Sequence, residues 1–258
     1  MILFLAGTSD ARELAIELKE KGFDPLTTVV TENASYALLE AGLRVHIGRL
    51  TAEEMAAIIQ EENMKAIVDA SHPFAEEASK NAIEAATNAG VPYFRYEREQ
   101  IDQYDDRVVS VATYEEAADV ALERKGNIML TTGSKTLETF AKKLIGVEGV
   151  RLIARMLPRL DNMEKCAALG VEQKNIVAIQ GPFSYELNRA LYQQFDVTIM
   201  VTKESGKVGS VDEKVEAALE LGIPVVMIRR PKIDYGEVYS SFAPLIEQLQ
   251  TTLEESVK

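Results

Sequence analysis

The sequence is poor in the residues from which disulfide scaffolds and metal centres are made. Its 258 residues include one cysteine, two histidines and no tryptophan. A single cysteine excludes an intrachain disulfide framework and a thiolate cluster, and two histidines argue against a histidine-based zinc site. We therefore expect no metal site. Cys166 lies in the helical pattern MEKCAALG and is interpreted as a small buried residue rather than a catalytic thiol.

Positive charge and long apolar runs are also scarce. The chain has 28 Lys+Arg against 41 Asp+Glu, a formal net charge of −13 at pH 7. This balance argues against nonspecific nucleic-acid binding and against docking on anionic lipid, so neither partner is expected. The apolar run at the N-terminus ends at Ala6, which is too short for a signal peptide or a membrane span. The expected location is the cytoplasm, and any anionic ligand requires a local island of positive charge.

The composition is otherwise that of a globular protein, with 47% hydrophobic and 27% charged residues. Short apolar runs alternate with longer amphipathic segments. In the first half we predict strands at 1–7, 25–31, 43–48, 65–71 and 91–97, and helices at 10–21, 35–42, 51–63 and 72–90. Thr51 and Glu54 form a capping-box pattern, and Pro73 and Gly90 mark the ends of the last helix.

The segment 97–111 interrupts this rhythm because it is polar and dense in charge. We interpret about 97–114 as a linker that contains one extra strand, VVSV at 108–111, after which five more strands alternate with helices. Strands separated by helices predict parallel sheets with right-handed crossovers. The sequence therefore predicts an α/β fold of two Rossmann-like domains with an interdomain cleft. The predicted domains are residues 1–100, which bind a dinucleotide, and residues 101–258, which bind the substrate.

The loop after the first predicted strand, GTSDAR, joins a strand to a helix. At this position dinucleotide-binding folds hold a pyrophosphate against a glycine and a helix N-terminus. The full G-x-G-x-x-G pattern is absent, because Ser9 and Arg12 occupy the later glycine positions, but hydroxyl groups can donate to phosphate oxygens instead. Ser9 as a plain helix N-cap is the alternative. The predicted cofactor-binding residues of this loop are Gly7, Thr8, Ser9, Asp10 and Ala11.

Two further strand ends carry candidate cofactor residues. Thr31 and Glu32 follow the second strand, where an acid accepts hydrogen bonds from the adenosine ribose and favours NADH over NADPH; a solvated loop acid is the alternative. Ser71, His72 and Pro73 follow the fourth strand. His72 is a candidate proton donor because the imidazole pKa lies near neutrality, and helix capping or packing is its alternative role. His46 lies within a strand pattern and is interpreted as structural.

Three loops of the second half combine small polar residues and glycine at strand ends. Their hydroxyls, amides and charges suit carboxylates or phosphates, and ligands of open α/β sheets bind beyond the carboxyl ends of the strands. Arg95 and Arg155 also lie at strand ends, where guanidinium groups match carboxylates, although any one of them is alternatively a solvated surface charge. The predicted loop residues are Thr132, Gly133, Ser134 and Lys135, then Gln180, Gly181, Pro182 and Phe183, and finally Lys203, Glu204 and Ser205.

In combination, these blocks resemble the precorrin-6A reductase family of cobalamin biosynthesis, whose anaerobic-pathway members are called cobalt-precorrin-6A reductases. The similarity runs in order over essentially the whole chain. Its blocks are GTSDARELA, VDASHPFAEEASKNAIEAATNAGVPYFRYER, TTGSKTLETF, RMLP, IQGPFS and VTKESG.

The resemblance implies two Rossmann-like domains and an enzyme that reduces one double bond of precorrin-6A or cobalt-precorrin-6A to give the 6B form. NADH or NADPH is the implied cofactor, and hydride passes from C4 of the nicotinamide to the macrocycle edge before a neighbouring carbon is protonated. It implies that the GTSDAR loop holds the pyrophosphate, that Glu32 faces the ribose, and that the SHPF loop lies near the nicotinamide. The later loops and the arginines would hold the acetate and propionate groups of the polycarboxylate tetrapyrrole-derived substrate.

Other cobalamin-pathway enzymes are candidate partners. Two other functions stay open at this point: another two-domain tetrapyrrole enzyme of the uroporphyrinogen-III synthase type, and a non-catalytic dinucleotide-binding module. Neither the presence of cobalt in the substrate nor the oligomeric state follows from the sequence.

Overall fold

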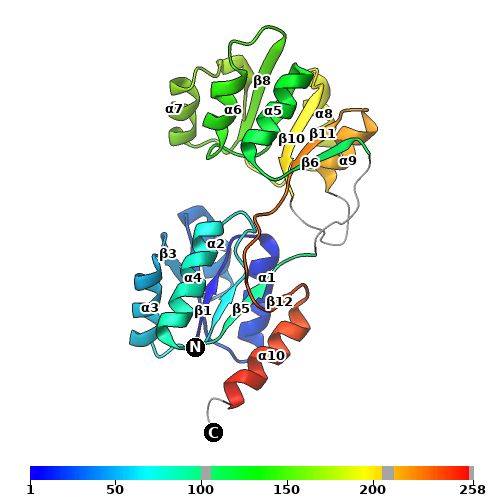
Figure 1. Ribbon diagram of the computed structural model, residues 1–258. Coiled ribbons are helices and arrows are strands. Elements are labelled where there is room, and N and C mark those ends of the chain that lie inside the picture. The colour runs from blue at the N-terminus through cyan, green and yellow to red at the C-terminus, as the bar shows by residue number, and fades with distance from the viewer. Residues whose placement is uncertain (100–105, 205–211, 256–258) are drawn as a thin grey trace. The chain divides into compact units, whose positions relative to one another are not determined.

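The chain folds into two α/β units, seen in a computed structural model that describes residues 1–99, 106–204 and 212–255 (Figure 1). The first unit comprises Met1–Glu99 together with Pro231–Lys258, and the second comprises Gln100–Arg230. Each unit is built on a six-stranded sheet, and every strand pair among the described residues is parallel. The predicted fold class, two Rossmann-like units with parallel sheets, is confirmed.

The first sheet has the strand order β3-β2-β1-β4-β5-β12, which is the 3-2-1-4-5-6 order of dinucleotide-binding folds. Its elements are β1 (Ile2–Leu5), α1 (Ser9–Glu20), β2 (Pro25–Val29), α2 (Glu32–Glu40), β3 (Arg44–Ile47), α3 (Ala52–Glu61), β4 (Ile67–Asp69), α4 (Glu76–Ala89), β5 (Tyr93–Tyr96), β12 (Val238–Tyr239) and α10 (Phe242–Glu255).

The sixth strand of this sheet comes from the end of the chain. β12 pairs with β5, with Val238 opposite Arg95, and α10 packs Leu245 and Leu249 into the core beside α1. The prediction that residues 101–258 form one C-terminal domain is therefore wrong for residues 231–258. The physical reason is that β5 would otherwise be an open sheet edge, with apolar surface on one face that α10 covers.

The first sheet is apolar on both faces because helices cover both. Ile2 and Phe4 of β1 contact one core with residues of α1 and α10, whereas Leu3 and Leu5 contact a second core with residues of α3 and α4. Successive strand side chains point to opposite faces, so the continuous apolar run MILFL serves both cores. The charged residues of the central strands are thereby placed at strand ends, as with Asp69 at the end of β4, whereas the buried Thr27 within β2 donates its hydroxyl to the Arg44 carbonyl.

The second sheet has the order β6-β11-β10-β7-β8-β9, which is the same spatial plan with its sixth strand, β6, taken from the start of the unit. The predicted strand 108–111 is this edge strand. The elements are β6 (Val108–Val111), α5 (Tyr114–Arg124), β7 (Gly126–Leu130), α6 (Leu137–Leu144), β8 (Val150–Met156), α7 (Leu160–Ala168), a 3₁₀ turn (Gln173–Asn175), β9 (Ile176–Ala178), α8 (Tyr185–Gln194), β10 (Ile199–Lys203), α9 (Glu213–Glu220) and β11 (Val225–Ile228).

Local signals in the sequence place most helix ends correctly. Thr51 and Glu54 form the predicted capping box of α3, and Gly90 ends α4 in the left-handed conformation with φ of 67°. Two starts differ from the prediction. α2 begins at Glu32, because Thr31 caps it by accepting from the Ala34 N–H, and α4 begins at Glu76 rather than near Pro73. Residues 72–75 instead form a turn closed by the Ala75 N–H and the His72 carbonyl, 2.7 Å apart.

Cys166 is buried in α7, with burial raising the pKa of its thiol, as expected for a packing residue. In the described part of the chain, no helix combines the length and apolar character that a bilayer crossing requires.

Candidate active site

The loops after β1 and β4 meet at the point where the strand order of the first sheet reverses. From β1 the chain moves to β2 on one side, and from β4 it moves to β5 on the other. Gly7 lies against the second loop: a Cβ at this position would be 2.9 Å from the backbone nitrogen of His72 and 3.4 Å from Cα of Ser71. A glycine is required here because any side chain would push the two loops apart. Open α/β sheets bind ligands at this switch point.

The first helix presents its N-terminus at the same place. Thr8, rather than Ser9, is the N-cap of α1, and its hydroxyl accepts from the Ala11 N–H at 3.2 Å. The alternative role of Ser9 as the N-cap is therefore wrong, because the cap is the preceding residue. The first N–H groups of a helix lack intrahelical partners and carry partial positive charge. Gly7, Thr8 and Ser9 thus bring a helix terminus suited to an anion to the switch point.

Asp10 is the member of the loop with an unexpected partner. Its carboxylate accepts two hydrogen bonds from Arg98, Nε to Oδ2 at 2.6 Å and Nη2 to Oδ1 at 2.5 Å. Burial raises the pKa of Asp10, but the hydrogen bonds from Arg98 and Thr8 and the charge of Arg98 lower it more, so the pKa lies below its ordinary value. The pair neutralises a carboxylate that would otherwise repel a phosphate at this helix end.

The second helix begins at the carboxyl end of β2, next along the sheet from β1. Thr31 is half-buried as its N-cap, and Glu32 is its exposed first residue. Both therefore lie at the sheet edge that also carries Gly7, because the carboxyl ends of parallel strands share one edge. The predicted cofactor residues Gly7 to Ala11, Thr31, Glu32 and Ser71 to Pro73 belong to one unit and one edge of its sheet.

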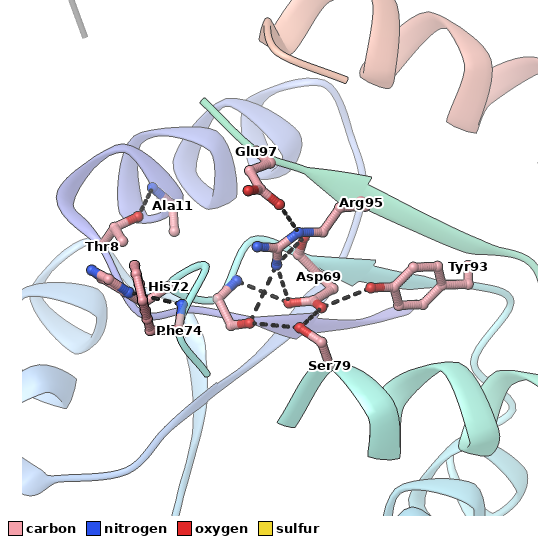
Figure 2. Close-up of polar contacts among 10 residues, drawn as sticks. Thr8, Ala11, Asp69, His72, Phe74, Ser79, Tyr93, Arg95 and Glu97 are labelled. Carbon is pink, nitrogen blue, oxygen red and sulfur yellow. Dashed lines mark hydrogen bonds and ion pairs between the residues drawn. The ribbon is translucent and has the colours of Figure 1, made fainter. Parts of the chain in front are cut away.

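The turn after β4 holds His72 through its own backbone (Figure 2). The Phe74 N–H donates to Nδ1 of His72 at 3.2 Å, and the two rings are 5.8 Å apart. A neutral ring that accepts at Nδ1 carries its proton on Nε2. His72 is half-buried, whereas its neighbours Ser71 and Pro73 are buried. In this neutral form the half-exposed imidazole therefore carries its donor nitrogen, Nε2, on a turn at the switch point.

Arg95 is completely buried, and its partners are inside the first unit. Nη1 lies 2.9 Å from Oδ1 of Asp69, and Nε lies 3.1 Å from Oε2 of Glu97 (Figure 2). Asp69 and Arg95 are direct neighbours across the β4–β5 pair. The prediction that Arg95 contacts substrate is corrected, because its guanidinium is buried and already paired with the carboxylate of Asp69.

The second sheet has its own switch point, between β7 and β10, where two of the predicted loops begin. Thr132 is buried and accepts from the Thr136 hydroxyl at 3.1 Å, while Gly133 adopts a φ of 81°. Lys203 ends β10, with its ammonium 5.5 Å from the centre of the Tyr114 ring. Burial, followed by the charges of Lys135 and Lys214, lowers the pKa of Lys203 to about 8. Lys203 and Lys135 therefore lie close enough to repel each other, while Lys214 is paired with Asp212 at 3.3 Å.

Arg155 and Phe183 come together at the carboxyl ends of β8 and β9. The buried Arg155 guanidinium stacks over the Phe183 ring at 4.3 Å and donates to Oδ1 of Asn188 at 2.7 Å. No carboxylate forms an ion pair with Arg155 in the described part of the chain. Gln180 leads into Gly181 and Pro182, which are joined by a cis peptide bond. A buried guanidinium held by a neutral amide and an aromatic ring retains the capacity to bind an anion.

Glu204, by contrast, is completely buried in a structural ion pair. It lies 3.2 Å from Nη1 of Arg229 and accepts from the Arg230 N–H at the same distance. The predicted contact of Glu204 with substrate is thus corrected in the same way as that of Arg95. Ser205, also predicted to bind substrate, lies outside the described residues.

Comparisons with known proteins show which family the chain is similar to. Residues 1–250 match the model of the precorrin-6x reductase family CbiJ/CobK. The chain is 63% identical over 249 residues to the cobalt-precorrin-6A reductase of Priestia megaterium, covering 96% of this chain and 98% of that protein. It is 34% identical to the cobalt-precorrin-6A reductase of Methanothermobacter thermautotrophicus, covering 98% and 85% respectively.

The chain belongs to the precorrin-6x reductase family. The resemblance stated from the ordered sequence blocks is confirmed, and the two other functions considered from the sequence find no support. The fold is shared with a solved structure of the CobK precorrin-6A reductase, with a TM-score of 0.80 at 23% identity, covering 97% of this chain and 96% of that one. Members of the family are reductases, which implies a nicotinamide cofactor.

Two residues that organise the site, Asp69 and Arg98, were not among the predicted site residues. Asp69 holds the turn before His72, and Arg98 neutralises Asp10. Asp69 has a signal that can be recognised in retrospect: an acid at a buried strand end requires a cationic partner, and Arg95 lies in the next strand of the sheet, β5. The pairing of Asp10 with Arg98 spans 88 positions and leaves no local pattern.

We expect the Asp10–Arg98 pair to stabilise the first unit. Breaking a largely buried pair leaves an uncompensated charge, so Asp10→Asn and Arg98→Met should each lower the free energy of unfolding by about 3 kcal/mol. The double variant should lose less than the sum of the two, with a coupling energy of about 2 kcal/mol. Denaturant unfolding of the four proteins measures this cycle, and additive losses would show that the pair is not coupled.

The same pair predicts a pH dependence. Because the folded-state pKa of Asp10 lies below its ordinary value, its stabilisation is present above about pH 4 and is lost as the pH falls through the folded value. The stability difference between the unmodified protein and Asp10→Asn should therefore shrink below about pH 4. A difference that stays constant down to pH 2 would contradict the assignment.

Proposed function

We propose that this protein is a cobalt-precorrin-6A reductase, which converts cobalt-precorrin-6A to cobalt-precorrin-6B in cobalamin biosynthesis with NADH or NADPH. The observation that carries the proposal is the 63% identity to a protein of that name over nearly the full length of both chains. The second relative, from an archaeon, has the same name. The cobalt-containing macrocycle is therefore favoured over the cobalt-free form.

The residues at the first switch point fit a dinucleotide. The close approach of Gly7 to the next loop, the N-terminus of α1 and the neutralised Asp10 together favour a pyrophosphate. Glu32 lies where an acid accepts from a ribose hydroxyl. When bound, NADH or NADPH supplies a hydride to one end of the macrocycle double bond, and a proton at the other end completes the reduction.

We assign the nicotinamide half of the cofactor to the turn formed by Ser71, His72 and Pro73. His72 is the proposed proton donor, because the turn places its half-exposed ring at the switch point and the imidazolium form of a histidine gives up a proton near neutral pH. The residue is half-exposed and its backbone nitrogen lies beside Gly7, which is compatible with access by a substrate. The contribution of the scaffold to the rate is mainly orientation of the two reactants.

The second unit is proposed to bind the acetate and propionate groups of the macrocycle. The buried guanidinium of Arg155 has no acidic partner among the described contacts, and Lys203 and Lys135 concentrate positive charge at the second switch point. Backbone and hydroxyl donors of the neighbouring loops supplement these charges. They belong to Thr132, Gly133, Ser134, Gln180 and Gly181, with Pro182 and Phe183 as apolar contacts.

The direct test is an anaerobic assay of cofactor oxidation. We expect NADH or NADPH oxidation that depends on added cobalt-precorrin-6A, with one cofactor consumed for each macrocycle reduced and a product heavier by two hydrogens. Cobalt-free precorrin-6A is the matched substrate control and should react more slowly. If titration calorimetry detects no binding of either cofactor at millimolar concentration, the reductase proposal is wrong.

Glu32 is expected to set the cofactor preference. Glu32→Ala removes the acceptor for the adenosine ribose hydroxyls, so it should weaken NADH binding about tenfold and NADPH binding much less. Glu40→Ala, at the exposed end of the same helix, is the matched control and should change neither affinity. Dissociation constants from calorimetry check this, and an unchanged NADH-to-NADPH ratio would remove Glu32 from the ribose site.

Lys203 should impose a pH limit on substrate binding. Its pKa is lowered to about 8 in the free protein, so the ammonium that attracts a carboxylate is lost as the pH rises through that value. We expect kcat/KM for the macrocycle to fall above about pH 8, and Lys203→Arg to extend the plateau because a guanidinium keeps its charge. Lys142→Met, at an exposed position of α6, is the control; a profile unaltered by Lys203→Arg would contradict the assignment.

A further inference from the structure

A buried polar network lies directly behind the turn that carries His72. The carboxylate of Asp69, at the end of β4, is completely buried and accepts from four donors (Figure 2). Oδ1 receives the Ser71 N–H and the Arg95 guanidinium, both at 2.9 Å. Oδ2 receives the hydroxyls of Ser79 and Tyr93, both at 2.7 Å. One carboxylate thus connects β4, β5, α4 and the turn.

Stability alone does not explain such a network. Removing two charges from water costs free energy that their attraction repays only when the geometry is excellent, and apolar replacements of buried pairs are often neutral or stabilising. The four donors do, however, satisfy the Asp69 carboxylate and restrict the backbone around it, while Nη2 of Arg95 has no hydrogen-bond partner among the described residues. The question is therefore which part of the backbone this network fixes.

The contacts point to the turn at residues 70–75. Asp69 holds the Ser71 N–H through Oδ1, and Arg95 Nη1 lies 3.3 Å from the Ser71 hydroxyl. The next backbone nitrogen, that of His72, is the atom that would lie 2.9 Å from a Cβ at Gly7. The position of Ser71 therefore sets both the distance between the two switch-point loops and the location of the imidazole.

The segment that returns from the second unit closes this network. The Tyr235 ring covers the Arg95 guanidinium at 4.7 Å, and burial raises the pKa of Tyr235. Glu97 receives Nε of Arg95 at 3.1 Å. Water is thereby kept away from the ion pair, which strengthens the interactions that hold Ser71.

We propose that Asp69 and Arg95 are positioning residues of the reductase, which fix the 70–75 turn against Gly7 in the arrangement that receives the nicotinamide half of the cofactor. This inference rests on the proposed function. It assigns these two side chains no contact with the cofactor: they act through the backbone of Ser71 and His72.

The test compares two variants that alter the same carboxylate in different ways. Asp69→Asn removes the charge that holds both Arg95 and the Ser71 N–H, whereas Tyr93→Phe removes one donor to Oδ2, the oxygen that does not hold the turn. We expect Asp69→Asn to raise the dissociation constant of the cofactor and lower kcat by at least tenfold each. Tyr93→Phe should change each by less than threefold, even where its melting temperature falls as far as that of Asp69→Asn.

Amide hydrogen exchange without any ligand gives the second readout. Residues 71–75 should exchange at least tenfold faster in Asp69→Asn than in Tyr93→Phe, with equal protection of β1 in both. If Asp69→Asn fails to fold, Arg95→Lys takes its place, because it keeps the charge and removes the guanidinium nitrogen that lies 3.3 Å from the Ser71 hydroxyl.

Equal exchange and equal cofactor affinity in the two variants would overturn the positioning role and leave a purely structural one. Failure of the proposed function has a different signature. In that case the unmodified protein itself binds no nicotinamide cofactor, while the exchange comparison still reports whether Asp69 holds the turn.

Discussion

The ion pair between Asp69 and Arg95 is the interaction on which the arrangement of the first unit's site depends. A carboxylate without contact with water is costly unless its oxygens accept hydrogen bonds and a cation lies beside it. That requirement gathers Tyr93, Ser79 and the Ser71 N–H around one carboxylate and so determines where the turn after β4 begins. Gly7 can approach this turn closely because it has no side chain, and the two loops meet at the switch point as a consequence.

The same constraint recurs at the equivalent place in the second unit. Glu204 follows β10 and Arg229 follows β11, which are the fourth and fifth strands of a sheet with the same spatial order as the first. Helices cover both faces of each sheet, so a buried charge needs a partner of opposite charge, and strand ends are where such partners meet. An acid and an arginine on neighbouring strand ends satisfy each other there, whereas the buried Arg155 is held by the Asn188 amide and the Phe183 ring.

Net charge says little about such sites. The chain carries −13, yet Arg98 cancels Asp10 at one helix terminus, and the positive charges of Lys135 and Lys203 lie close together at the second switch point. The potential that an anionic ligand meets is set by charges within about 10 Å, because salt screens those farther away. A strongly acidic sequence is therefore compatible with a site for a dinucleotide and a polycarboxylate.

The sequence by itself determined the features whose causes are local. Alternating apolar runs predicted the parallel sheets, Thr51 and Glu54 predicted the capping box, and the ordered blocks from GTSDARELA to VTKESG identified the family. Tertiary structure alone decided that residues 231–258 complete the first sheet, that α4 begins at Glu76, and that Arg95 and Glu204 pair with other side chains of the protein. The reason is physical: strand order and ion pairing join residues far apart in the chain, and such contacts impose no periodicity on the sequence between them.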